Sequence, residues 1–147
     1  MRREYPEHPL PAVSCVLFNE KGQVLMARRK NPPAQGKWSL PGGVIKTGEE
    51  LEDALKREMS EESGLEVKVD SLLSVSSRIV KNAKGEVQYH FVLLDYLCKQ
   101  IGGLLKAGSD ASEIRWVPRD EIKDLETTEG VVDVILKGKS RLRYNKK

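Results

Sequence analysis

A helix predicted between Thr47 and Gly64 sets the strongest limit on how this chain folds, because it ends in a group of glutamates. Thr47 followed three residues later by Glu50 is the pattern of a capping box at a helix N-terminus. Gly64 can readily adopt the left-handed conformation that ends a helix. We therefore expect about four helical turns between these positions.

One face of this helix changes from apolar to acidic along its length. At roughly 100° per residue, its first two turns carry an apolar stripe, and its last two turns continue the stripe with carboxylates. The apolar members are Leu51, Ala54 and Leu55, and the acidic members are Glu58, Glu61 and Glu62. Each anion in the last turn costs about 0.3–1 kcal/mol against the helix dipole, and the carboxylates also repel one another. Another group must offset this charge.

A divalent cation is the simplest such group. Arg57 is adjacent in sequence, but a single guanidinium cannot neutralise three carboxylates. Magnesium binds one or two protein carboxylates together with waters and substrate phosphates. The paired glycines Gly42 and Gly43 allow a turn that can bring a backbone carbonyl beside the acidic end as another ligand. The alternatives are a solvated acidic face for the helix and an ordinary tight turn for the glycines.

The rest of the chain predicts a mixed sheet flanked by helices, which is an α/β fold. Residues 12–18 and 23–27 are β-rich and are separated by the polar turn Asn19–Gly22, which indicates a hairpin. Residues 65–80 and 87–99 form two more predicted strands around a turn at 81–85, and Pro118 closes a short strand at 114–118. Residues 28–37 are predicted to form a loop, and helical periodicity returns between Ile122 and Leu136.

Length and composition indicate a single domain over residues 1–147, since 147 residues with 39% hydrophobic side chains can bury one continuous core. The apolar runs are too short for a membrane span, and the N-terminus lacks the apolar core of a signal peptide. Cys15 and Cys98 lie in predicted strands without metal-ligand spacing, so we expect buried, reduced thiols. These features favour a cytoplasmic protein without a membrane partner.

The charge distribution is uneven. Residues 137–147 carry six basic side chains and no acidic one, which leaves 19 basic and 22 acidic side chains in the remainder, a balance of −3. Such a tail could contact nucleic acid or a polyphosphate by releasing counterions. A solvated terminus is the more frequent role of a short charged run, so a nucleic-acid partner is not expected.

A longer pattern around the helix resembles the signature of the Nudix hydrolase family. Nine specified positions over 23 residues match it, namely Gly43, Glu49, Arg57, Glu58, Met59, Glu61, Glu62, Gly64 and Leu65. The resemblance implies an α/β/α sandwich with a mixed central sheet and a loop-helix-loop catalytic motif. It also implies hydrolysis of a nucleoside diphosphate linked to another group, with Mg²⁺ as the cofactor and Mn²⁺ as a possible substitute.

The resemblance also implies roles for individual residues of the motif. Glu58 and Glu62 correspond to the principal metal ligands, and Glu61 to a further ligand or a carboxylate that orients water. The Gly42 carbonyl resembles a backbone ligand to the metal. Glu49 and Arg57 resemble the pair that braces the catalytic helix.

Candidates outside the motif are less specific. Asp110 and Glu113 lie in a loop that could supply one more catalytic acid, with Asp110 preferred, or both could be solvated. Arg28 and Arg29 could bind substrate phosphates through forked hydrogen bonds, and Gly43 could approach the substrate. Aromatic side chains at Trp38, Tyr89 and His90 could stack on a base, although residues of this kind in strands are more often part of the core.

The substrate is the least specified property of the chain. The resemblance is greatest to small enzymes that hydrolyse ADP-ribose to AMP and ribose 5-phosphate. The proline that follows the motif in one ADP-ribose subgroup is missing, since the first proline after Leu65 is Pro118. The main alternative is a MutT-like nucleoside triphosphate pyrophosphohydrolase, and a further one is a binding module that has lost turnover. The family and the exposed strand edges favour a homodimer.

Overall fold

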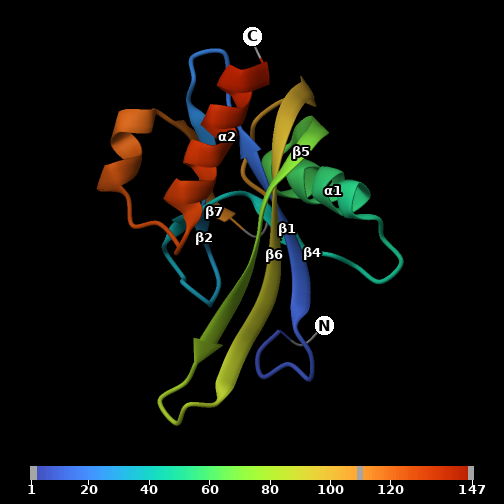
Figure 1. Cartoon of the computed structure of the whole chain (residues 1–147), viewed down its shortest axis with the longest axis vertical. Coiled ribbons are helices and arrows are strands. Elements are labelled where there is room, and N and C mark those ends of the chain that lie inside the picture. The colour runs from blue at the N-terminus through green and yellow to red at the C-terminus, as the bar shows by residue number, and fades with distance from the viewer. Residues whose placement is uncertain (1–2, 109–110, 146–147) are drawn as a thin grey trace.

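The computed structural model describes residues 3–108 and 111–145 and contains two sheets with a helix on either side (Figure 1). Its elements follow the order β1 Leu10–Leu17, β2 Val24–Arg29, β3 Trp38–Ser39, β4 Gly42–Val44, α1 Leu51–Ser63, β5 Leu65–Lys81, β6 Val87–Gly103, β7 Ala111–Val117, the 3₁₀ helix η1 Arg119–Asp124, and α2 Val131–Asn145.

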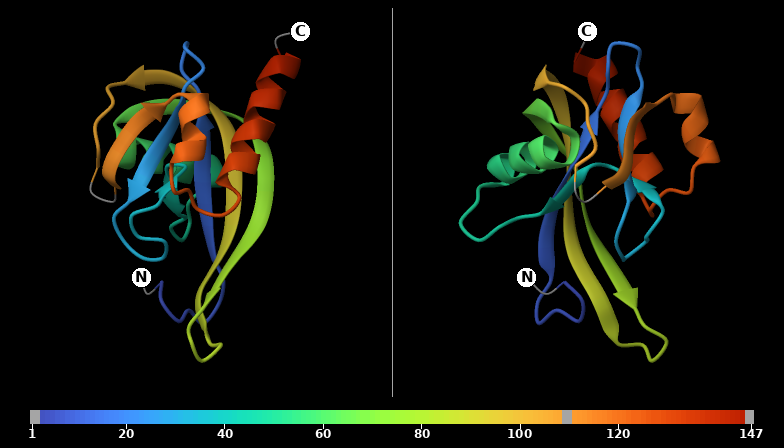
Figure 2. Two further views of the ribbon diagram at one scale, coloured as in Figure 1. Left: turned by 90° about the vertical axis from the view of Figure 1, so that its left-hand side faces the viewer. Right: turned by 180° about the vertical axis from the view of Figure 1, so that it is seen from behind.

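The larger sheet is mixed, as predicted. Its strand order is β4-β1-β6-β5, with β1 parallel to β6 and the other neighbours antiparallel. The smaller sheet has the order β3-β2-β7 and is antiparallel. Figure 2 shows α1 and α2 on opposite sides of the strands. The α/β/α arrangement expected from the sequence is therefore confirmed.

Two apolar clusters hold these layers together. The first cluster joins the larger sheet to α1 and includes Val13, Leu55 and Met59. The second cluster lies between the sheets and α2 and includes Val16, Met26 and other buried residues of both sheets. The two clusters face opposite sides of β1, because successive side chains of a strand alternate between its faces. The assignment of residues 1–147 to a single domain stays a prediction.

The first predicted hairpin is correct in its turn and wrong in its pairing. Gly22 N–H donates to the Asn19 carbonyl at 3.0 Å, so the chain reverses where expected. Beyond an isolated bridge between Phe18 and Val24, however, β1 and β2 diverge into different sheets. The turn residues specify the reversal, but the partners of each strand depend on residues far away in the sequence, which local patterns do not reveal.

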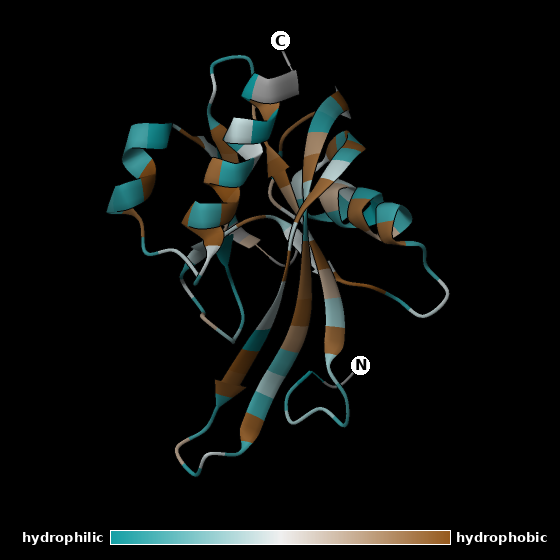
Figure 3. Ribbon diagram, viewed as in Figure 1, coloured by the Kyte–Doolittle hydropathy of each residue, from teal (hydrophilic) through white to brown (hydrophobic). Residues whose placement is uncertain are grey.

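The second predicted hairpin is confirmed. Strands β5 and β6 pair along their length, and β6 extends past the predicted end to Gly103. The distal part of this hairpin projects from the body of the molecule, and apolar and polar residues alternate along it (Figure 3). Strand β5 is a sheet edge that exposes Leu72, Val75 and Ile79. An exposed strand edge of this kind can pair with a second copy of the chain, and the homodimer stays a prediction.

The capping box predicted for the central helix is wrong. Helix α1 begins at Leu51, its N-cap is Glu50, and no side chain caps it. Gly48 has φ +86°, so the chain is not helical there, and the Glu49 carboxylate accepts the Lys46 N–H at 3.0 Å instead. Leu51, expected in the apolar stripe, is 38% exposed.

The predicted C-terminal stop of this helix is confirmed. Gly64 lies in the left-handed region with φ +75°, and its N–H donates to the Ser60 carbonyl at 3.0 Å. The loop before β7 binds the next carbonyls, since Lys106 N–H donates to Ser63 and Gly108 N–H donates to Glu62, both at 2.8 Å. These bonds satisfy carbonyl groups whose partial charge would otherwise oppose the acidic side chains.

The basic stretch near the C-terminus is not a free tail up to Asn145, because these residues belong to α2. Arg141 Nη1 donates to Ser71 Oγ at 2.9 Å and to the Leu72 carbonyl at 3.3 Å, which ties the helix to β5. Cys15 and Cys98 are buried free thiols, as predicted, and burial raises the pKa of Cys15. In the part of the chain that the structure describes, no helix is long and apolar enough to cross a membrane.

Candidate functional site

Helix α1 places two of its three terminal carboxylates in the interior. Ala54, Leu55 and Met59 are fully buried, and the same face of the helix carries Glu58 and Glu62, which are 7% and 9% exposed. The Glu61 side chain is 54% exposed on the outer side of the helix. The predicted inward orientation therefore holds for Glu58 and Glu62 but not for Glu61.

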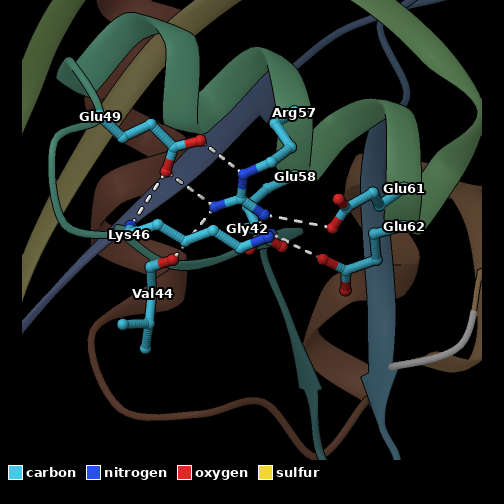
Figure 4. A network of polar contacts seen from close by, with 8 residues as sticks. All are labelled: Gly42, Val44, Lys46, Glu49, Arg57, Glu58, Glu61 and Glu62. Carbon is cyan, nitrogen blue, oxygen red and sulfur yellow. Dashed lines mark hydrogen bonds and ion pairs between the residues drawn. The ribbon is translucent and has the colours of Figure 1, made fainter. Parts of the chain in front are cut away.

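Arg57 connects the acidic residues of this region (Figure 4). Its Nε and Nη2 donate to the two oxygens of Glu49 at 2.6 and 3.0 Å. Its Nη1 donates to Glu58 at 2.8 Å and to Glu61 at 3.2 Å, and Nη2 also donates to the Val44 carbonyl at 3.2 Å. The bond to Glu49 is the main reason that the pKa of Arg57 is raised. The prediction that Glu49 and Arg57 form a bracing pair agrees with this geometry.

The charge of this group remains strongly negative. The carboxylates of Glu49, Glu58, Glu61 and Glu62 and the guanidinium of Arg57 together carry a formal charge of −3. Burial of Glu58 and Glu62 increases the cost of this charge, because a buried anion is poorly solvated. The arrangement therefore favours binding of a cation.

The ion pair between Glu49 and Arg57 has a testable pH dependence. Hydrogen bonds from Arg57 and from the Lys46 amide lower the pKa of Glu49 to about 2. The unfolded value is about 4.3, so the native state binds fewer protons than the unfolded state between these values. The stabilising contribution of Glu49 is therefore complete above about pH 4.3 and is lost as the pH falls toward about 2.

We expect the difference in melting temperature between the natural protein and Glu49→Gln to stay constant from about pH 7 to about pH 5 and to shrink below about pH 4. Thermal unfolding followed by circular dichroism over this range measures it. The same substitution at Glu52, which lies exposed in the first turn of α1, is the control. A difference that already shrinks near neutral pH would contradict the lowered pKa of Glu49.

The two glycines of β4 leave room for atoms of α1 and of β1. A Cβ atom on Gly43 would lie 2.5 Å from the Glu58 carboxylate, and one on Gly42 would collide with the Val13 carbonyl oxygen. Gly42 N–H donates to Glu62 Oε2 at 2.9 Å. The structure thus shows an amide contact from Gly42 to the acidic pair, and the predicted role of the Gly42 carbonyl stays a prediction.

Glu58, Glu62 and both glycines border a cavity of about 520 Å³ that extends from α1 across the larger sheet to α2. Its lining also includes four cationic side chains from the N-terminal segment, the end of β2, the loop that follows β2, and β5. These side chains are Arg3, Arg29, Lys30 and Arg78. The cavity therefore combines buried carboxylates with separate cationic groups, as a site for a phosphate-bearing ligand and a metal ion would.

The candidates outside the motif are distributed unevenly around this cavity. Arg29 lines it, with Nε donating to the Pro33 carbonyl at 2.7 Å. Arg28 is not part of the lining, and its Nε donates to the Gly36 carbonyl at 3.0 Å. Glu113 is exposed and lies 3.6 Å from Arg115. Asp110 lies outside the described residues.

Trp38 and Tyr89 lie in the core rather than at the cavity, and His90 is partly buried and is not part of the cavity lining. Trp38 is 7% exposed, packs in the cluster between the sheets and α2, and has the Arg115 guanidinium 4.8 Å from its ring centroid. Tyr89 is 8% exposed and stacks on Phe91 with centroids 6.3 Å apart. The structure therefore supports the alternative given above, in which aromatic residues of the strands form part of the core.

One polar pair on the cavity wall was missed by the sequence reasoning. Asp95 on β6 is 7% exposed, and Ser14 on β1 donates a hydrogen bond to its Oδ1. Burial raises the pKa of Asp95, while the Ser14 bond and the charge of Lys137 act in the opposite direction. A signal was present, since Asp95 continues the alternate positions of Phe91 and Leu93 and interrupts an apolar strand.

The residues of this site fit a hard divalent cation by donor chemistry. Two buried carboxylates on one cavity wall match an ion that binds one or two carboxylates and completes its shell with water and phosphate oxygens. Within residues 3–108 and 111–145, however, no three acidic, histidine or cysteine side chains are gathered as a complete metal-binding group. Glu61 is turned outward toward Arg57, so a metal cluster of all three glutamates stays a prediction.

Several known proteins resemble this chain in sequence and in fold. A family model described as the NUDIX domain matches residues 8–135. An ADP-ribose pyrophosphatase of Methanocaldococcus jannaschii is 37% identical over 118 residues, which cover 80% of this chain and 67% of that protein. The 8-oxo-dGDP phosphatase NUDT18 of Homo sapiens is 32% identical over 114 residues, 75% of this chain and 32% of that protein. The crystal structure of a MutT NUDIX hydrolase from Burkholderia pseudomallei superimposes with a TM-score of 0.73 at 26% identity, covering 89% of this chain and 98% of that one.

Proposed function

Because the chain belongs to the Nudix hydrolase family, we propose that it hydrolyses the pyrophosphate bond of ADP-ribose to give AMP and ribose 5-phosphate, with Mg²⁺ as its cofactor. Nudix hydrolases generally use divalent metal ions. The observation that carries the proposal is the cavity that brings together Glu58, Glu62 and four cationic side chains. The similarity to an ADP-ribose pyrophosphatase supports the choice of substrate.

In this proposal, Glu58 and Glu62 hold the metal ion, with the Gly42 carbonyl and Glu61 as further ligands or water-orienting groups. When bound, the ion polarises the phosphate oxygens and lowers the pKa of an attacking water, and Mn²⁺ could replace Mg²⁺. The chain keeps the two buried carboxylates in place through separate contacts. Arg57 binds Glu58, and the Gly42 amide binds Glu62.

In this proposal, the cationic residues of the cavity bind the phosphates of the substrate directly. Arg29 lies on the cavity wall at the end of β2, and Arg78 lies on β5. A guanidinium can bind a phosphate through two parallel hydrogen bonds, which orients the phosphate as well as attracting it. We propose that these arginines hold the phosphates in line for attack. Asp110 remains our candidate for an additional catalytic acid, ahead of Glu113.

A product assay tests the proposed substrate. The purified protein is incubated with Mg²⁺ and with ADP-ribose or a nucleoside triphosphate, and the products are identified by chromatography. AMP with ribose 5-phosphate supports the proposal, and removal of the metal with a chelator should abolish product formation. Absence of hydrolysis of ADP-ribose under conditions in which triphosphates are hydrolysed would reject ADP-ribose.

The second candidate is hydrolysis of nucleoside triphosphates, including oxidised ones, to monophosphates and pyrophosphate. The similarity to the 8-oxo-dGDP phosphatase NUDT18, a protein named for an oxidised nucleoside diphosphate, supports the oxidised base. Release of inorganic pyrophosphate from triphosphates distinguishes this reaction from the first in the same assay. The two candidates share the metal-binding residues and differ in the group that occupies the rest of the cavity.

Gly43→Ala should reduce turnover by ~10–100-fold, because the new methyl group would displace the Glu58 carboxylate, and misplacement of a catalytic group by about 1 Å can have this effect. Gly102→Ala is a matched control. A Cβ at Gly102 would also meet a glutamate carboxylate, 2.7 Å away at Glu66, but that side chain is exposed and can move. Equal activity of the two variants would contradict the position assigned to Glu58.

A further inference from the structure

The floor of the cavity is built from the alternate residues of three adjacent strands. The pairing register of β4, β1 and β6 places Gly42, Ser14 and Asp95 in one row across the larger sheet. The next row on the same face contains Val44, Ala12 and Leu93. All six residues line the cavity. One row is therefore polar and the neighbouring row is apolar.

The apolar row continues along the same face of β6. Phe91 lies two residues before Leu93 and also lines the cavity, and it is 7% exposed. From the other side, Val131 and Val134 of α2 contribute to the lining. A flat ring placed between these surfaces would bury its two faces against apolar atoms, which stabilises binding by removing apolar area from water.

The Asp95 carboxylate presents one oxygen to this space. Its Oδ1 accepts the Ser14 hydroxyl. No described residue donates a hydrogen bond to Oδ2. Every fully buried side-chain oxygen among the described residues has a hydrogen-bond partner, so Oδ2 is not fully buried. Because Asp95 lines the cavity, Oδ2 is accessible from it. A largely buried acceptor at the edge of an apolar surface is suited to bind an N–H donor of a ligand.

The distance from the acidic wall fits a ligand that extends beyond its phosphates. Asp95 lies two strand spacings from Gly42, or about 10 Å, since neighbouring strands are about 4.8 Å apart. The Gly42 amide is bound to Glu62, where the proposed function places the diphosphate. This separation leaves room for a ribose between the diphosphate and a group bound at Asp95.

From this arrangement, and resting on the proposed function for the place of the diphosphate, we infer that Asp95 is the residue that recognises the nucleobase of the substrate. Its Oδ2 accepts a hydrogen bond from an N–H group at the edge of the base, and the ring lies over the apolar row of Ala12, Val44 and Leu93. Ser14 is a positioning residue, because it holds the carboxylate through Oδ1.

Equilibrium binding tests this inference without requiring turnover. Isothermal calorimetry is used to measure the affinities of AMP, GMP, CMP, UMP and ribose 5-phosphate for the natural protein, Asp95→Asn and Ser14→Ala. Ribose 5-phosphate carries the sugar and the phosphate but no base. Asp133→Asn, on the exposed side of α2, is the matched control. Thermal unfolding confirms that each variant is folded.

We expect at least one nucleoside monophosphate to bind the natural protein tenfold or more tightly than ribose 5-phosphate. Asp95→Asn should reduce this preference by about tenfold, because the neutral amide removes the charge of the acceptor and replaces one of its two oxygens with a donor, and a hydrogen bond to a charged group is roughly twice as strong as one between neutral groups. Ser14→Ala should reduce the preference in the same direction by a smaller factor, and Asp133→Asn should preserve it. A general loss of structure would weaken binding of ribose 5-phosphate as well.

Three results would overturn the inference. The first is a natural protein without any preference for nucleoside monophosphates over ribose 5-phosphate. The second is an unchanged preference in Asp95→Asn. The third is equal weakening of all five ligands in a folded Asp95→Asn variant, which would assign Asp95 to the sugar. Failure of the proposed function is seen separately, as absence of metal-dependent hydrolysis by the natural protein.

Discussion

Glu62→Gln is expected to lower kcat by ~10³-fold while leaving the protein folded. Glutamine has nearly the same size as glutamate, and its side-chain oxygen can still accept the Gly42 amide that now binds Glu62 at 2.9 Å. The substitution removes the negative charge on a residue that is 9% exposed and that we assign to metal binding. A metal ion contributes several kcal/mol to the stabilisation of the transition state, and about 4 kcal/mol corresponds to a thousandfold change in rate.

We would measure kcat at saturating substrate and Mg²⁺, with the compound that the natural protein hydrolyses as the substrate. The midpoint of urea unfolding is measured on the same variants. Glu66→Gln is the control, because Glu66 is an exposed glutamate on β5 close in sequence to α1. We expect the control to keep its activity. Activity of Glu62→Gln within about twofold of the natural protein would reject the role of Glu62, since a ligand charge is worth far more than that.

Arg57→Lys is expected to reduce the free energy of unfolding by about 2 kcal/mol and kcat by ~10–100-fold, although it preserves the charge. The guanidinium donates through three nitrogens to Glu49, to Glu58 and to the Val44 carbonyl at the same time. A lysine ammonium is a single point donor on a flexible stem and cannot reproduce this fork. The Arg57 side chain is 20% exposed and that of Glu58 is 9% exposed, so solvent replaces the lost contacts poorly.

Urea unfolding at neutral pH measures the change in stability, and the same preparation is used for kcat. Arg119→Lys, at an exposed position of η1, is the matched control and should change neither quantity. A stability loss below about 0.5 kcal/mol for Arg57→Lys would show that the network behaves as an ordinary surface ion pair. Glu49 and Glu58 would then be held in place by other contacts.

The sequence predicted the parts of the site that depend on local spacing. The interval between Glu58 and Glu62 is one helical turn, so both carboxylates share the buried face, and Gly64 ends the helix because a glycine accepts the left-handed conformation. The capping box failed because Gly48 breaks the helical path before Glu49. The same spacing puts Glu61 at the edge of the acidic face of the helix. In the structure its side chain turns outward to solvent, because a small difference in angle decides whether a residue at the edge of a face is buried or exposed.

The part of the site that sequence could not predict depends on contacts between distant segments. Ser14 and Asp95 are adjacent because β1 and β6 pair in parallel, a pairing that no turn or local pattern specifies. For the same reason β1 and β2 were predicted as a hairpin, although they join different sheets. Arg29 and Arg28 are neighbours in the chain, and only the fold shows that Arg29 lines the cavity and Arg28 does not.

The acidic wall formed by Glu58 and Glu62 is expected to bind a divalent cation. Anomalous diffraction from crystals of the protein soaked in Mn²⁺ tests it most directly, with Glu62→Gln crystals soaked in parallel. We expect an anomalous peak bonded to carboxylate oxygens of both Glu58 and Glu62 in the natural protein and a weakened or missing peak in the variant. Well-ordered carboxylates of Glu58 and Glu62 with no anomalous peak between them at millimolar Mn²⁺ would contradict it.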